Sequence, residues 1–187
     1  MSLTKSAIVG VTLLLGACAS QPDLYPVMAP TVAEKVRISF RAVEVRDISL
    51  PNYAAADEIA VQDANGKLVT KSDTLWADNP ERAVGLELSR NLTRLTGARI
   101  ASEPWPFESF PDARLELRFE RLLAGADGQF RASGQYFVGV TDGGRERSGL
   151  FDLAVPFDPT GGPHAIASAR GQVILDLAAY IARNGLR

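Results

Sequence analysis

The chain has 187 residues, among them one cysteine and one histidine, and its 20 basic and 22 acidic residues give a net charge of −2. This near-neutral charge disfavours nucleic-acid binding, which needs a basic face or stripe. One cysteine and one histidine cannot supply the three or four ligands of a Cys/His metal site, so only carboxylate sites stay open. The 46% apolar fraction suffices for one conventional core without disulfide bonds.

Residues 1–17 have the outline of a secretory signal peptide. The uncharged run 7–17 is about half as long as a membrane-spanning helix, which needs about 20 apolar residues. Leu15-Gly16-Ala17 before Cys18 matches the lipobox that lipoprotein signal peptidase cuts, although Ala17-Cys18-Ala19 also fits the A-x-A site of ordinary secretion. The lipobox is favoured because it explains why a chain bound for an oxidising compartment keeps one cysteine at this position.

Cys18 is therefore predicted to be the first residue of a mature lipoprotein. Resemblance to bacterial lipoproteins implies a diacylglycerol thioether and an amide-linked acyl chain on Cys18, and Ala19 in place of aspartate favours the outer membrane. Several acyl chains together anchor a protein stably. Residues 18–34 contain three prolines and few large apolar side chains, which predicts a flexible tether, and residues 35–187 are predicted to form a single periplasmic domain.

The first half of this domain carries three local signals. Alternating residues 36–40, followed by Val43 and Val45 on a shifted phase, predict one strand with a bulge. Asn65-Gly66 between two β-prone runs predicts a hairpin. Residues 78–81 supply an N-cap, a first-turn proline and an acid, and they open a predicted helix that ends at Gly97. The stripe of this helix consists of Val84, Leu88, Leu92 and Leu95.

A short strand at residues 98–101 is expected to lead into residues 103–111, where three prolines predict an irregular loop. Trp105, Phe107 and Phe110 in this loop either pack onto the sheet or form a low-entropy contact surface, and we consider them a candidate partner contact. Trp76, just before the first helix, is expected to be a core or staple residue.

From residue 113 to residue 155, apolar and polar residues alternate along three segments that two glycine-containing turns separate. This pattern predicts a three-stranded antiparallel meander. Pro163 opens a final helix that ends at Gly185 and is expected to lie on the sheet, with Arg170, Asp176 and Arg183 off its apolar stripe. Together these elements predict an α+β fold: a mixed, mainly antiparallel sheet with two amphipathic helices packed on one face.

Candidate chemistry is sparse. His164 with Ser168 one turn later is weak evidence for a hydrolase, because no G-x-S-x-G motif accompanies the pair. Glu116 and Glu120 alternate with arginines on the polar face of a predicted strand, where ion pairing explains them more simply than acid–base catalysis. We therefore predict a protein without catalytic residues, bound metal or cofactor, apart from the covalent lipid on Cys18.

The order of features resembles the ABC-type transport auxiliary lipoproteins, a Pqi-like family. The resemblance rests on the lipobox, the tether, Leu50-Pro51-x-Tyr53, the Asn65-Gly66 hairpin, and Leu75-Trp76-Ala77-Asp78 before the first helix. It implies a non-enzymatic outer-membrane lipoprotein that works with MCE-domain proteins and an ABC-type or Pqi-like complex to move lipids across the periplasm and maintain the envelope. Homo-oligomer formation is open. The alternative is a lipid-anchored ligand-binding module, which would have an apolar cavity between sheet and helices.

Overall fold

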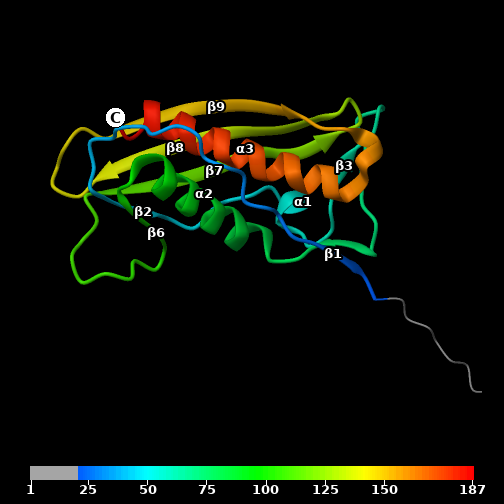
Figure 1. Ribbon diagram of the computed structural model, residues 1–187, viewed down its shortest axis with the longest axis horizontal. Coiled ribbons are helices and arrows are strands. Elements are labelled where there is room, and N and C mark those ends of the chain that lie inside the picture. Colours follow the sequence, from blue (N-terminus) through cyan, green and yellow to red (C-terminus); the bar gives the residue numbers. More distant parts are fainter. Residues whose placement is uncertain (1–20) are drawn as a thin grey trace, which may run out of the picture.

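The computed structural model describes residues 21–187 and shows a sheet with two long helices on one face (Figure 1). The helices are α2 (Pro80–Thr96) and α3 (Gly162–Asn184). The predicted α+β fold with a mixed sheet is confirmed. The predicted signal peptide, its Leu15-Gly16-Ala17 cleavage motif and Cys18 lie outside the described residues.

One side of the sheet is the predicted meander of β7 (Ala113–Gly125), β8 (Gln129–Val140) and β9 (Arg147–Pro156), in which adjacent strands pair antiparallel. The register of β7 against β8 shifts between Phe119 and Arg121, which marks a bulge. Before this bulge, apolar and charged residues alternate strictly along β7, so the apolar face meets the helices and the charged face meets solvent.

Shorter strands line the other side of β7. Near its start, β2 (Ala42–Val45) pairs parallel with β7 and also with β6 (Arg99–Ser102). Near its end, β3 (Val61–Gln62) pairs parallel with β7 and antiparallel with β4 (Leu68–Val69). The predicted Asn-Gly hairpin is thereby confirmed, and β4 forms an edge of the described sheet.

The ends of α2 follow from its sequence signals. The Asn79 side chain accepts the Arg82 backbone N–H at 3.0 Å, and Pro80 occupies the first turn. Gly97 ends the helix with a φ of 72°, and its N–H donates to the Thr93 carbonyl. The predicted start and stop of this helix are confirmed. The one-turn helix α1 (Asn52–Ala55) and strand β5 (Thr74–Trp76) precede it.

The predicted strand at residues 36–45 is wrong over its first half. Only residues 42–45 form a strand. The Val36 N–H donates to the Leu95 carbonyl and the Ser39 N–H to the Leu186 carbonyl, each at 2.8 Å, so this segment crosses the ends of both helices. It supplies donors to carbonyls that a helix end leaves without partners. Its alternating apolar side chains pack against the core.

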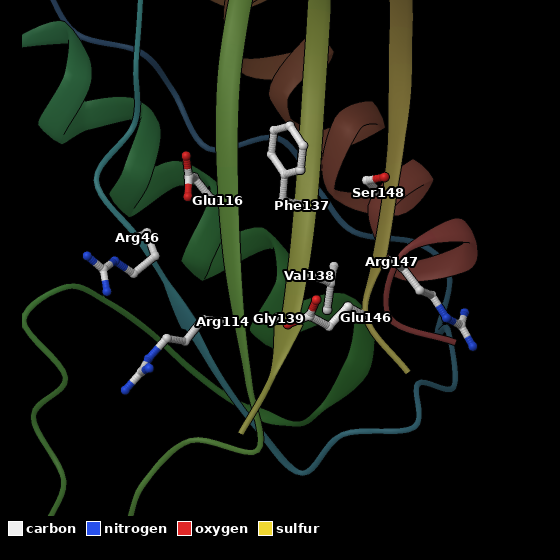
Figure 2. Close-up of a pocket in the computed structure, with 9 residues that line it drawn as sticks. All are labelled: Arg46, Arg114, Glu116, Phe137, Val138, Gly139, Glu146, Arg147 and Ser148. Carbon is white, nitrogen blue, oxygen red and sulfur yellow. The ribbon is translucent and has the colours of Figure 1, made fainter. Parts of the chain in front are cut away.

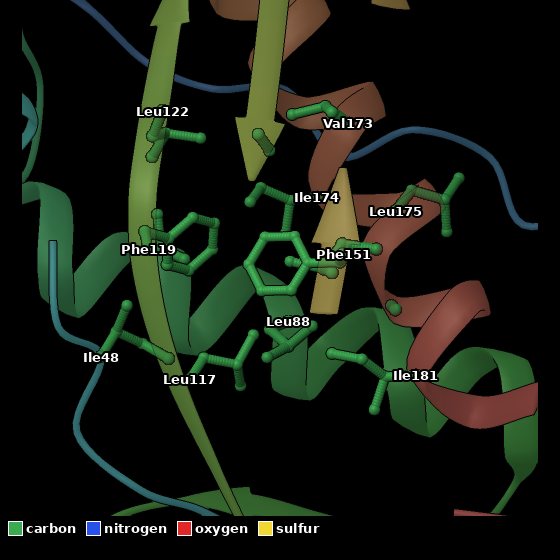
Figure 3. Packing of buried hydrophobic residues seen from close by; sticks show 14 of the residues in the cluster. Ile48, Leu88, Leu117, Phe119, Leu122, Phe151, Val173, Ile174, Leu175 and Ile181 are labelled. Carbon is green, nitrogen blue, oxygen red and sulfur yellow. The ribbon is translucent and has the colours of Figure 1, made fainter. Parts of the chain in front are cut away.

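The layer between sheet and helices is filled by side chains (Figure 3). Leu88, Leu117 and Ile174 have no exposed surface. Phe119 and Phe151 meet edge to face, with ring centroids 5.2 Å apart. The segment Pro159–Asn184 is apolar and long enough to cross a membrane, but 67% of its most apolar stretch is buried inside this domain, as for a core helix.

The structure also corrects the predicted tether, because residues 23–34 pack against the domain. We call these residues the N-terminal arm. Strand β1 (Asp23–Tyr25) pairs parallel with β5, and the arm then crosses α3 at Gly171, where a Cβ atom would lie 2.7 Å from the Met28 carbonyl oxygen. Glu34 ends the arm in an ion pair with Arg183 at 2.6 Å. Proline favours the extended backbone that strand pairing and this crossing require.

Candidate functional site

The aromatic loop (residues 103–111) leaves the sheet between β6 and β7 and closes on itself. Trp105 Nε1 donates to the Ser109 carbonyl oxygen at 2.6 Å. The rings of Trp105 and Phe107 meet edge to face at 4.9 Å, and the Arg99 guanidinium lies 5.0 Å from the centre of the Phe107 ring. These contacts give the loop a defined shape.

The same loop presents its aromatic side chains to solvent. Phe110 is 78% exposed and Phe107 is 42% exposed, whereas Trp105 is half-buried. The structure therefore does not pack all three aromatics onto the sheet, and the partner contact stays a prediction. Large aromatics on a shaped loop are typical of residues that dominate protein–protein contacts.

The residues considered for catalysis are not brought together. His164 and Ser168 are both exposed in the first turns of α3, and no carboxylate lies within ion-pair distance of His164 among residues 21–187. Glu116 pairs with Arg118 at 2.6 Å, and Glu120 accepts a hydrogen bond from Gln135 at 3.1 Å. The described part of the chain holds no group of three His, Cys, Asp or Glu side chains with metal-site geometry.

The open face of the sheet carries a polar groove of about 480 Å³ (Figure 2). Figure 2 shows Arg46 and Arg114 at one side of the groove and Arg147 at the other. Arg114 pairs with Glu44 and Arg46 pairs with Glu103, each at 2.9 Å. Because Arg46 and Arg114 are matched by carboxylates within the domain, most of the positive charge at this groove is already paired.

Sequence reasoning missed a buried ion pair between the helices. Arg170 was expected off the stripe of α3, but only 2% of its side chain is exposed, and it bonds Glu87 of α2 at 3.3 Å. Its guanidinium also lies 4.5 Å from the centre of the Trp76 ring. The predicted placement of Trp76 against the core is confirmed. The missed signal was spacing, since Arg170 stands four residues from both Ile166 and Ile174.

Burial controls the charge state of this pair. It raises the pKa of the Glu87 carboxyl above its ordinary 4.5, against the opposing attraction of the Arg170 and Arg90 guanidinium groups. Burial also lowers the pKa of Arg170. A cavity of about 310 Å³ beside the pair is bounded by Tyr25 and Val27 of the N-terminal arm. The arm therefore covers the place where the two helices carry their buried charges.

The two ends of strand β7 mark two ends of the molecule. It begins directly after the aromatic loop, at what we call the loop end, and its last residues pair with β3, at what we call the hairpin end. Its 13 residues span about 40 Å at about 3.3 Å per residue. The described chain starts at the hairpin end, because Asp23 pairs with Thr74 and the Thr74 carbonyl accepts the N–H of Ile59, two residues before β3.

Comparison with known proteins identifies relatives of this fold. The model of a family described as "ABC-type transport auxiliary lipoprotein component" matches residues 24–182, a range that begins inside the N-terminal arm. A crystal structure of an uncharacterized protein is similar with a TM-score of 0.69 and 20% identity, covering 87% of this chain and 97% of its own. One from Xanthomonas campestris has a TM-score of 0.61 and 18% identity, covering 86% and 95%. These two structures share the fold, and no curated protein matches the chain.

Proposed function

Because the chain belongs to the ABC-type transport auxiliary lipoprotein family, we propose that it is an accessory subunit of an envelope lipid transporter built from MCE-domain proteins and an ABC-type or Pqi-like complex. In this proposal the protein is held at the outer membrane by acyl chains on Cys18 and acts by binding, without catalysis or a bound cofactor. The observation that carries the proposal is the family match across nearly the whole described domain.

The aromatic loop is the proposed contact with the MCE-domain partner. Phe107 and Phe110 offer apolar surface that nothing in residues 21–187 covers, and the Trp105–Ser109 bond shapes the loop before any partner arrives. A pre-shaped loop loses less conformational entropy on binding, which favours affinity. A partner contact at this loop would explain why Phe107 and Phe110 are exposed instead of packed in the core.

The proposed anchor would orient the domain. Cys18 precedes Asp23 by five positions, a stretch that spans at most about 17 Å. Anchoring at Cys18 therefore holds the hairpin end near the membrane and leaves the loop end about 40 Å further along β7. The aromatic loop would then face the periplasm, where a partner from the inner membrane can reach it.

The alternative function, a ligand-binding module, has less support. It expects an apolar cavity between sheet and helices, whereas Leu88, Leu117 and Ile174 in that layer are closely packed with no exposed surface. An apolar cavity of about 410 Å³ lies instead at the hairpin end. A docking subunit with a solid core accounts for this arrangement more directly.

Crosslinking in cells tests the proposed partnership. The full-length protein is co-expressed with an MCE-domain protein from the same cell, crosslinked and purified, with palmitate labelling as the check on the anchor. We expect the MCE-domain protein to co-purify with the wild type, and the Cys18→Ala variant to lose the palmitate label. A clean negative with both proteins expressed would contradict the partnership, and a Cys18→Ala variant that still takes up palmitate would contradict the anchor.

A further inference from the structure

The hairpin end carries exposed apolar side chains that the fold does not explain. Leu68 is 39% exposed and Val69 is 44% exposed, and together they make up the whole of strand β4. This strand pairs with β3 on one side and is an edge of the described sheet on the other. An edge strand made of two exposed aliphatic residues is a candidate contact surface.

The residues that flank Leu68 and Val69 include two lysines, a residue type that is rare in this chain. Lys67 and Lys71 are two of only four lysines, whereas arginine supplies the remaining 16 basic residues. Both lysines are exposed, and neither takes part in an ion pair within residues 21–187. The nearby Asp63 carboxylate is turned into the hairpin, where it accepts the N–H groups of Asn65 and Lys67 at 2.9 Å each. The two ammonium groups are therefore available to an external partner.

An apolar cavity of about 410 Å³ extends the same surface. Val69 of the hairpin forms part of its wall, and Lys71 stands among its lining residues. Further apolar side chains come from residues at and before β3, from the segment that leads into α3, and from the first turns of α3; they include Ile59, Val61, Phe157, Pro159 and Ile166. Lysine side chains that rim an apolar surface can lay their methylene stems along it and keep the charge at its edge.

The start of the N-terminal arm lies close to the hairpin, which points to the membrane as the partner of this surface. Figure 1 shows β1 and β3 toward the same end of the molecule, opposite the C-terminus. Asp23 pairs with Thr74, three residues after Lys71. Cys18 can therefore lie no more than about 17 Å from Asp23. With acyl chains on Cys18, the membrane surface comes within reach of the hairpin.

We infer that the β3–β4 hairpin is a second membrane contact, which inserts Leu68 and Val69 into the interfacial region of the lipid bilayer. Lys67 and Lys71 then lie at the level of the lipid phosphates, where cationic side chains are favoured. The inference rests on the proposed anchor at Cys18. Acyl chains alone fix one point, whereas acyl chains and a hairpin together fix the direction in which the domain stands.

Depth-dependent fluorescence quenching tests the inference on the lipidated full-length protein. Leu68→Trp places a reporter on the hairpin, and Leu150→Trp is the matched control, because Leu150 is 70% exposed on β9 away from this end. Each variant is reconstituted into vesicles of phosphatidylethanolamine and phosphatidylglycerol with brominated acyl chains, and the wild-type signal of Trp76 and Trp105 is subtracted. We expect several-fold stronger quenching and a blue-shifted emission for Leu68→Trp only.

Flotation of the same vesicles separates this inference from the proposed function. Floating protein in which Leu68→Trp and Leu150→Trp are quenched equally overturns the hairpin contact and leaves the anchor standing. Protein that does not float overturns both. Val69→Trp provides a second reporter if circular dichroism shows that Leu68→Trp is misfolded, and the same quenching is expected of it. The experiment contains no MCE-domain protein, so its outcome is independent of the partnership.

Discussion

The N-terminal arm, which starts at the hairpin end, and the aromatic loop at the loop end are both rich in proline, yet the arm is bound to the domain and the loop projects from it. In the arm, Tyr25 and Val32 pack against the core, the Asp23 N–H donates to the Asp73 carbonyl at 2.8 Å, and the Tyr25 carbonyl accepts from the Ala77 N–H at 3.1 Å. The loop contains three large aromatics, two of them well exposed. Backbone pairing, the close approach at Gly171 and the packing of Tyr25 and Val32 against the core thus hold the arm on the domain.

The largest effect is expected beneath the N-terminal arm, at the Arg170–Glu87 pair. Arg170→Ala leaves the Glu87 carboxylate buried without its cation and removes the guanidinium from the Trp76 ring. We expect a loss of about 3–5 kcal/mol in the free energy of unfolding, measured by urea denaturation.

A double variant is the control for this substitution. Arg170→Met with Glu87→Leu removes both charges and keeps most of the packed volume, so the free energy of unfolding should stay close to that of the wild type. If Arg170→Ala were as stable as this double variant, the unpaired buried charge would not affect the free energy of unfolding.

How far the sequence predicts this molecule depends on whether the signal is local. The ends of α2 were predictable because Asn79, Pro80 and Gly97 act within one turn of the helix. The segment 36–40 was not, because an extended chain that crosses two helix ends has the same alternating pattern as a strand. Glu87 lies 83 residues from Arg170, so no local pattern could pair them. Whether Phe110 is exposed likewise depends on the tertiary fold.

A smaller effect is expected where the N-terminal arm crosses α3. Gly171→Val places a branched side chain where even a Cβ atom would lie 2.7 Å from the Met28 carbonyl oxygen, so the arm must move. We expect a loss of about 1–3 kcal/mol and faster proteolysis within residues 23–34. Ser168→Val, at an exposed position of the same helix, is the control and should leave the arm resistant. Unchanged proteolysis of Gly171→Val would show that the crossing does not hold the arm.

The buried carboxyl of Glu87 predicts a pH dependence in the same region. Because its pKa is raised in the folded state, the folded protein binds more protons than the unfolded protein between pH 4.5 and that raised value. The contribution of Glu87 to stability is therefore present below pH 4.5 and declines as the pH rises through this window. Urea denaturation across the window should show this decline in the wild type and not in Glu87→Gln. Equal slopes in the two proteins would contradict it.

The smallest effect on stability is expected at the loop end, and it gives the sharpest contrast with Arg170. Phe110→Ala removes a side chain that is 78% exposed, so the free energy of unfolding should change by less than about 0.5 kcal/mol. Phe107→Ala also loses the contacts of its ring with Trp105 and Arg99, so a loss of about 1 kcal/mol is expected. Trp105 is left intact because its bond to Ser109 shapes the loop. If the loop is the partner contact, crosslinking to the MCE-domain protein should fall several-fold, whereas Leu150→Ala should change neither measurement. Unfolding of these variants would show that the loop belongs to the core, and full crosslinking would move the partner contact elsewhere.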